Sequence, residues 1–318
     1  MYTSCNSHWI GLAYLLANYV CYVQRFMLTL HFTEHRRLFK SKYGLLNQVV
    51  PHMLCALYGV PVGVYRLHHC IMHHVEDNHA PFDTTSTEPY QRDSLCHFSW
   101  YWFRHAVLAW VELPLYAWRK GRCALAAGGL ASEIAYWTVI VALWRVNHVA
   151  TLWTLLVPYV VTSLAAMFGN WGQHVFIAPD GSGGAYGSAY NCVSCDDNRR
   201  TYNDGYHIQH HLNSRCHWSE LPHAFLASLA QHDAADALVF HSIGFFDVGI
   251  AVFTGRLEFL ARHIVPCGPR QEKRTQAEWV QLLKGRLLPI KGSKCFSSAP
   301  PKQVVAAQSE RVKRVLST

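Results

Sequence analysis

Charged residues are scarce in this chain of 318 residues. Lys, Arg, Asp and Glu together make up 15% of it, whereas hydrophobic residues make up 51%. An average soluble domain has about 25% charged residues, so the composition argues against that class. Aromatic residues are plentiful, with 11 Trp, 16 Tyr and 15 Phe, and such residues gather at membrane–water interfaces. The composition therefore predicts a membrane protein.

The chain also lacks a disulfide framework. It has 11 cysteines, an odd number at irregular spacing, which excludes a small disulfide-stabilised scaffold. We expect reduced thiols on the cytosolic side or within apolar helices. The N-terminal apolar run has neither a basic leader nor a small-residue cleavage site, so no cleavable signal peptide is expected. Internal repeats and heptads are missing too.

Long apolar runs recur along the chain. Residues 149–168 carry no charge, and about 20 such residues can cross a hydrocarbon core. Residues 43–65 are also uncharged, but Pro51, Gly59, Pro61 and Gly63 interrupt them. The full set of apolar segments is 9–23 (continuing through FMLTL), 43–65, 98–118, 123–144, 149–168 and 237–253.

Basic residues are concentrated toward the C-terminus. From Arg256 to Thr318 there are 13 Lys or Arg and 4 Asp or Glu, whereas the first 255 residues have 15 and 16. We therefore predict two parts: a membrane-embedded domain over 1–255 and a basic, loosely ordered tail over 256–318. The basicity favours the cytosolic or stromal face. A nucleic-acid partner is not expected.

Histidines, of which there are 21, gather in short clusters. These are HFTEH (31–35), HHCIMHH (68–74), HIQHH (207–211) and GNWGQH, which places Asn170 four residues before His174. On a helix, residues three or four apart share a face. That periodicity predicts that His69 and His73 share a face, with His74 about a third of a turn away. Neutral imidazole is a good ligand for iron, zinc and copper.

Topology gives an independent check. All clusters must face one side of the membrane if they bind one metal centre. Only 33 residues separate His35 from His69, whereas two crossings need about 40. Residues 43–65 should therefore dip in and return, or lie along the surface. Segments 123–144 and 149–168 then form a hairpin, and 98–118, with Arg104 and Glu112, lies in the interface.

The order HxxxH, HxxxHH, NxxxH, HxxHH resembles the membrane fatty acid desaturase and hydroxylase superfamily, over roughly residues 9–255. The resemblance implies an all-α integral membrane protein whose histidine-rich extramembrane cap holds two iron ions. It also implies that dioxygen is used to oxidise a lipid acyl chain. Carried over residue by residue, the metal ligands are His31, His35, His69, His73, His74, His174, His207, His210 and His211.

The resemblance assigns supporting roles as well. Asn170 matches the family's asparagine that holds a metal-bound water. The clusters 31–35, 68–74 and 207–211 correspond to the family's first, second and third histidine boxes, and His68 is a reserve ligand at the edge of the second box. No haem-binding HPGG motif of a fused b-type cytochrome is present. The electrons should therefore come from a separate protein, a ferredoxin or a b-type cytochrome. We expect the membrane of either the endoplasmic reticulum or a plastid, with the histidine boxes and the C-terminal tail on the cytosolic or stromal face.

Acidic residues beside the boxes are candidates to orient the imidazole rings. They are Glu34, Glu76, Asp77 and Asp204, for which surface ion pairs are the alternative. Cys192 and Cys195 form one CxxC, which we interpret as loop cysteines because a second such pair is missing.

Fatty acid desaturation is the leading hypothesis. A lipid hydroxylase on the same scaffold, a histidine-lined metal transporter or zinc-binding membrane receptor, and a zinc amidase remain open.

Overall fold

The protein is described by a computed structural model that covers residues 6–179 and 184–293. The chain divides into two compact units. The first contains the described residues up to Met72 together with Arg104–Met167, and the second contains His73–Phe103 and the described residues from Phe168 onward. The fold is mostly helical, as predicted.

Helices make up the first unit. A continuous helical run from His8 to His35 opens it, with a π-helical turn in its middle. The elements are α1 (His8–Asn18), η1 (Tyr19–Val23), α2 (Gln24–His35), η2 (Ser41–Gln48), η3 (Val49–Leu54), η4 (Cys55–Tyr58), α3 (Val64–Arg66), η5 (Leu67–His73), α6 (Cys123–Val146), α7 (His148–Thr151) and η6 (Leu152–Leu156). The last residue of η5, His73, already belongs to the second unit, and two further helices, α5 (Leu95–Arg119) and α8 (Val157–Gln173), each contribute residues to both units.

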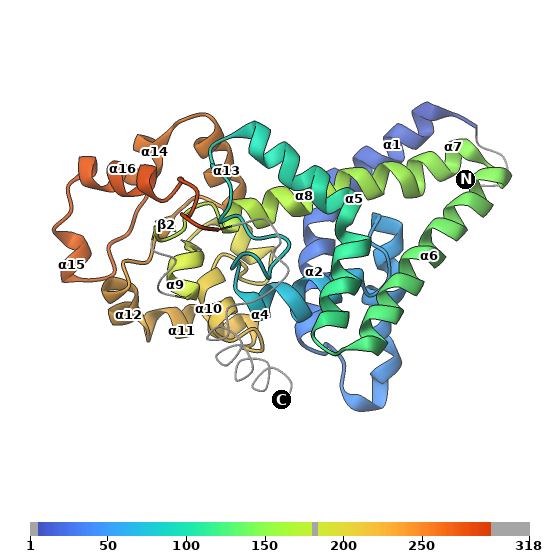
Figure 1. Ribbon diagram of the computed structural model, residues 1–318, viewed down its shortest axis with the longest axis horizontal. Helices are drawn as coiled ribbons and strands as arrows, with labels where there is room; N and C mark the ends of the chain where they lie inside the picture. The colour runs from blue at the N-terminus through green and yellow to red at the C-terminus, as the bar shows by residue number, and fades with distance from the viewer. Residues whose placement is uncertain (1–5, 180–183, 294–318) are drawn as a thin grey trace. The chain divides into compact units, whose positions relative to one another are not determined.

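The predicted hairpin is present in this unit. Helix α6 ends at Val146, and Figure 1 shows α7 starting after a sharp turn. Asn147 stabilises the turn because its side-chain oxygen accepts a hydrogen bond from the Ala150 amide at 2.9 Å. Helix α6 and the continuous run His148–Gln173 are long and apolar enough to cross a membrane, judged by length and composition. Tyr136, Ile140 and Leu155 form the core between the two arms.

Residues 43–65 form broken turns, as their prolines and glycines predict. Gly59 ends η4 in the left-handed region with φ +75°. A Cβ there would lie 2.2 Å from the Tyr159 backbone nitrogen, so only glycine fits. Helix α5 is continuous, and a 2.7 Å ion pair joins its buried Arg104 to the half-buried Glu112. Where these segments lie relative to a bilayer stays a prediction.

The second unit consists of short helices around one small sheet. Strands β1 (Asn191–Val193) and β2 (Val239–His241) pair in parallel, with Cys192 opposite Phe240, so the all-α prediction misses this element. The remaining elements are α4 (His74–Glu76), α9 (Ala185–Ser188), η7 (Asp196–Arg199), α10 (His207–Leu212), η8 (Trp218–Glu220), α11 (Leu221–Leu226), α12 (Leu229–Ala234), α13 (Phe245–Phe253), α14 (Leu257–Arg262), α15 (Pro269–Glu272) and α16 (Gln276–Gly285).

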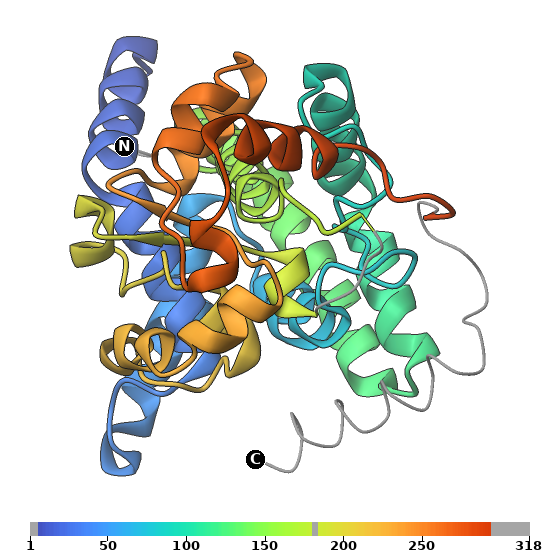
Figure 2. The ribbon, with the colours of Figure 1, turned by 90° about the vertical axis from the view of Figure 1, so that its left-hand side faces the viewer.

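The basic C-terminal segment is folded over much of its length. Helices α14 and α16 pack side by side, as Figure 2 shows for the orange and red helices. Trp279 and Leu283 of α16 are buried. The loosely ordered tail expected from Arg256 is therefore not found over Leu257–Gly285, because these apolar side chains have a core to enter. The rest of the predicted tail, residues 294–318, lies outside the described residues, and the boundary at 255 stays a prediction.

Candidate metal centre

Four histidines of the second unit point the same ring nitrogen at one another. They come from η5 (His73), from the residue after α8 (His174) and from α10 (His207 and His211). The Nε2–Nε2 distances are 3.2 Å from His73 to His174, 3.3 Å from His174 to His207 and 3.2 Å from His207 to His211. All four side chains lie in the interior.

Hydrogen bonds at the opposite ring nitrogen fix the tautomer of three of these rings. The Nδ1 of His73 lies 2.6 Å from Asp83 Oδ2, and that of His211 lies 3.0 Å from Asp77 Oδ1. The Nδ1 of His174 lies 2.7 Å from the Ser188 carbonyl oxygen. Carboxylate and carbonyl oxygens only accept hydrogen bonds, so Nδ1 carries the proton in each ring. Each Nε2 is therefore left with a bare lone pair facing its neighbours.

The charge state of the cluster follows from its burial. Burial holds the pKa of His174 well below its usual range, and positive charge on His73 or His211 would lower it further. Burial also keeps the pKa of His207 far below normal. Burial lowers the pKa of His211, although its bond to Asp77 opposes the shift. Burial therefore favours the neutral form of His174, His207 and His211, which is the state that binds a metal.

This donor set fits a transition-metal ion. Imidazole nitrogens bind such ions at about 2.0–2.1 Å, so neighbouring ligand nitrogens lie about 2.8–3.4 Å apart. The observed separations of 3.2 and 3.3 Å fall in that range. Bare lone pairs at this distance repel each other, and a bound cation would turn the repulsion into attraction.

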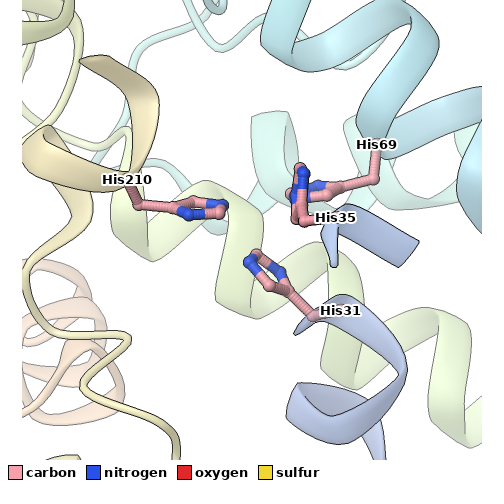
Figure 3. A group of neighbouring side chains, drawn as sticks. All are labelled: His31, His35, His69 and His210. Carbon is pink, nitrogen blue, oxygen red and sulfur yellow. The ribbon is translucent and has the colours of Figure 1, made fainter. Parts of the chain in front are cut away.

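A second cluster lies in the first unit. Figure 3 shows the rings of His31, His35 and His69 turned toward one another, with one ligand nitrogen of each within 4.8 Å of the others. His31 and His35 are one turn apart on α2, and their ring centroids lie 5.1 Å apart. The Nδ1 of His31 lies 3.2 Å from the Tyr65 hydroxyl, and Cys70 Sγ lies 3.7 Å from His35 Nδ1.

The histidines of the second box divide between the clusters. His69 lies with His31 and His35, whereas His73 belongs to the cluster of the second unit. Leu67–His73 is a π-helix rather than an α-helix, in which residues four apart still lie close to one face, so the expectation that His69 and His73 share a face stays a prediction. His74 lies instead beside His210, with ring centroids 4.6 Å apart. The reserve ligand His68 pairs with the ring of His105 at 5.0 Å.

Asn170 is connected through its side-chain amide nitrogen to the loop that contains Asp83, the partner of His73. That nitrogen donates to the Tyr101 hydroxyl at 2.7 Å and to the Thr85 carbonyl at 3.4 Å. Thr85 in turn donates its backbone N–H and its hydroxyl to Asp83 Oδ1, both at 2.7 Å. Asn170 therefore supports the loop that orients His73 through Asp83. Its predicted water-positioning role stays a prediction.

The carboxylates named from the sequence divide into different roles. Asp77 orients an imidazole, as predicted. Asp204 accepts instead from Gln173 Nε2 at 2.9 Å, and burial raises its pKa to about 7. Glu34 accepts from Arg66 at 3.2 Å, which is the ion-pair alternative, and Glu76 is buried. Asp83, the partner of His73, was missed because it lies ten residues from that ring.

A buried polar network around Asn191 holds the histidines of residues 207–211 in place. The sequence does not indicate this network. Asn191 Oδ1 accepts from the Ile208 amide at 2.9 Å, and its Nδ2 donates to Gln209 Oε1 at 2.8 Å. Both amides approach Nε2 of His232 at 3.3 Å. A six-residue helix is too short to hold itself in place, so these contacts fix α10. No spacing rule connects residues so far apart in the sequence.

The CxxC begins in β1, where Cys192 is buried, and only Cys195 lies in the loop after the strand. Cys195 Sγ lies 4.0 Å from the Cys192 carbonyl oxygen. Burial raises the pKa of both thiols. Since the thiolate is the metal-binding form, the raised pKa values argue against the pair as metal ligands, whereas the interpretation as loop cysteines is wrong for Cys192, which lies in a strand.

Comparison with known protein families gives a match. The model of the family described as "Fatty acid desaturase" matches residues 7–242. The chain belongs to the fatty acid desaturase family. The matched range includes every histidine of the two clusters, and it ends before α13. No curated protein and no solved structure matches the chain. Membership in the desaturase family indicates an oxidoreductase that acts on lipid acyl chains, and its histidine clusters are compatible with metal binding.

Proposed function

We propose that this protein is a membrane-bound fatty acid desaturase that uses two iron ions and dioxygen. One ion would be held by His73, His174, His207 and His211, and the other by His31, His35 and His69. His74 and His210 are further ligands implied by the family's pattern. The proposal rests most directly on the convergence of Nε2 lone pairs in the second unit.

The protein's own residues have definite tasks in this proposal. Asp83, Asp77 and the Ser188 carbonyl hold the proton on Nδ1, so that Nε2 faces the metal. The burial of the rings excludes water from around them. When bound, the irons supply an oxidant strong enough for an unactivated C–H bond.

The overall reaction removes two hydrogens from adjacent acyl carbons, leaving a double bond. Dioxygen is reduced to two waters, with two protons and two electrons taken up in addition. The electrons would come from a ferredoxin or a b-type cytochrome.

Desaturation and hydroxylation differ in their products. Expression in a desaturase-deficient host, followed by lipid profiling, should give acyl chains two hydrogens lighter than the substrate. A hydroxylase would instead give products one oxygen heavier, and that result would replace desaturation with the alternative. The acyl chain and the bond position would be read from the same profile.

The metal proposal has its own test. Protein purified from iron-replete cells should hold close to two irons per chain, and His207→Ala should lose iron and turnover. A matched control is His223→Ala, since His223 is exposed on α11 and should leave both unchanged. Stoichiometric zinc with little iron would exclude the oxidation reaction.

The membrane arrangement can be tested separately. We propose that all boxes and the C-terminal residues face the cytosol or stroma, with α6 and the run His148–Gln173 crossing the membrane. In sealed vesicles with that face outward, protease should digest residues 175–235 and the C-terminus. Protection of both, with digestion of the opposite face, would reverse the orientation.

A further inference from the structure

Arg92 is a fully buried cation close to the metal-site framework. It lies in the loop between α4 and α5, and its exposed fraction is 0%. Its own backbone carbonyl accepts from the Trp171 indole at 3.1 Å, and its backbone N–H donates to Leu287 O at 3.0 Å. A buried charge is costly unless its hydrogen-bond donors are satisfied, so the guanidinium of Arg92 needs acceptors in the interior.

Six backbone carbonyl oxygens receive the guanidinium. Nε donates to Val175 O at 3.0 Å and to Arg286 O at 3.3 Å, and Nη2 donates to Arg286 O at 2.9 Å and to Leu288 O. Nη1 donates to the carbonyls of Thr87, Glu88 and Tyr90, at 3.1, 3.3 and 3.2 Å. A planar fork with five N–H donors is the side chain that can reach so many acceptors.

Two of these carbonyls lie next to the metal cluster. Val175 directly follows His174, and the Thr87 hydroxyl donates to the His174 carbonyl oxygen at 2.6 Å. Thr87 is also held by Asn78, whose Oδ1 accepts the Thr87 amide at 3.0 Å. Arg92 therefore holds two pieces of backbone beside His174: Val175, which follows it, and Thr87, whose hydroxyl contacts its carbonyl oxygen.

Two more of these carbonyls, those of Arg286 and Leu288, belong to the segment after α16, residues 286–290. Its backbone contacts both the chain that follows His174 and the loop between α4 and α5. The Ile177 amide donates to Arg286 O at 3.1 Å, and the Ile290 amide donates to Glu88 O at 2.9 Å. Leu287 is buried at 2% exposure. This segment lies beyond the range matched by the family model, which ends at residue 242.

We propose that Arg92 is a positioning residue that joins the C-terminal segment 286–290 to the backbone around His174 and so sets the metal affinity of the second-unit cluster. The proposal rests on the proposed function, since it concerns the same metal-binding histidines. It adds a role for a part of the chain outside the family match. Arg92 acts through backbone carbonyls and does not itself bind the metal.

Two substitutions test this role at different points of the network. Arg92→Lys keeps the charge but replaces the planar fork with a single ammonium, which cannot reach six carbonyls. Thr87→Val removes only the hydroxyl that holds His174 O, while Thr87→Ser keeps it. Arg274→Lys is the matched control, because Arg274 belongs to the same unit but is paired with Asp236.

The measurement is the affinity of the full-length, detergent-purified protein for Co²⁺, by competition with a chelator and by the visible spectrum of the bound ion. We expect Arg92→Lys and Thr87→Val to weaken one of the two Co²⁺ sites by about 10- to 100-fold. Thr87→Ser and Arg274→Lys should bind like the wild type. Melting temperatures of the metal-free proteins identify any variant that fails to fold. If Arg92→Lys does not fold, the Co²⁺ affinity of Thr87→Val compared with that of Thr87→Ser decides whether the network sets metal affinity.

The outcomes separate the two proposals. If the wild type binds two Co²⁺ ions and both Arg92→Lys and Thr87→Val keep its affinity and spectrum, the positioning role is wrong while the metal site stands. An equal loss of affinity in Arg274→Lys also overturns the role, because the effect is then general destabilisation. A wild type that binds no Co²⁺ overturns the metal site and the role together.

Discussion

Asp83 offers the sharpest test of how the protein prepares His73 for a metal. Its carboxylate is buried, and both oxygens accept hydrogen bonds. Oδ2 accepts from His73 Nδ1 at 2.6 Å, and Oδ1 accepts from the amide and hydroxyl of Thr85 at 2.7 Å. In Asp83→Asn one of these oxygens becomes an NH₂ group, which is a donor. The new donor must face either Thr85 or His73.

Either orientation of the new amide disrupts the site. If the NH₂ group faces Thr85, donors oppose donors, at a cost of about 1–3 kcal/mol for buried groups left without partners. If it faces His73, the ring must move its proton to Nε2 to accept at Nδ1. That proton would occupy the lone pair that points at His174 Nε2, 3.2 Å away, and His73 could no longer bind a metal.

We expect Asp83→Asn to weaken metal binding about 10- to 100-fold, as is typical for loss of a partner that orients a metal-binding histidine. This corresponds to about 1.4–2.7 kcal/mol of binding free energy. Co²⁺ titration with a competing chelator at pH 7.5 measures it. The control is Asp196→Asn, the same change at an exposed position of the same unit. A folded Asp83→Asn protein with the wild-type dissociation constant would refute the tautomer argument.

Three further changes have distinct expected outcomes. Asn170→Ala should keep its iron but turn over about 10- to 100-fold more slowly; a wild-type rate would end any supporting role for Asn170. Cys192→Ser combined with Cys195→Ser should leave iron content and activity intact, and loss of metal would make the pair a ligand. Asp204 has a pKa raised from 3.8 to about 7 by burial, so its neutral form is favoured by folding and its contribution to stability falls as pH rises from about 4 to 7. Asp204→Asn should therefore melt higher than the wild type at pH 8 and show a smaller gain at pH 5; equal melting temperatures at pH 8 would contradict the shift.

The parts of the site that the sequence predicts are those governed by local periodicity. His31 and His35 meet because they are four residues apart on α2, and His207 meets His211 on α10 for the same reason. The hairpin after α6 follows equally from hydropathy and from the turn at Asn147. In each case the interacting residues lie within one element or in consecutive ones.

Prediction fails where the contacts join distant parts of the chain. His69 and His73 belong to different histidine clusters, and no local pattern in HHCIMHH predicts that division. The partners of the rings come from loops and distant segments: Asp83 for His73, and the Ser188 carbonyl for His174. Every residue type has the same backbone carbonyl, so the sequence does not indicate that the Ser188 carbonyl accepts from His174.

The C-terminal segment shows a different kind of failure. Its basic composition suggests a loosely ordered tail, although local signals for a folded helix are present in the same residues. Thr275 and Glu278 form a capping box at the start of α16, and Trp279, Leu283 and Leu287 recur at every fourth residue and are buried. These positions predict an amphipathic helix with one face in a core. Averaging charge over all residues from Arg256 onward conceals that face, since an amphipathic helix carries its basic residues on the other side. The pattern of apolar positions is therefore a better guide than net charge to where a basic segment folds, and here it leads directly to the backbone held by Arg92.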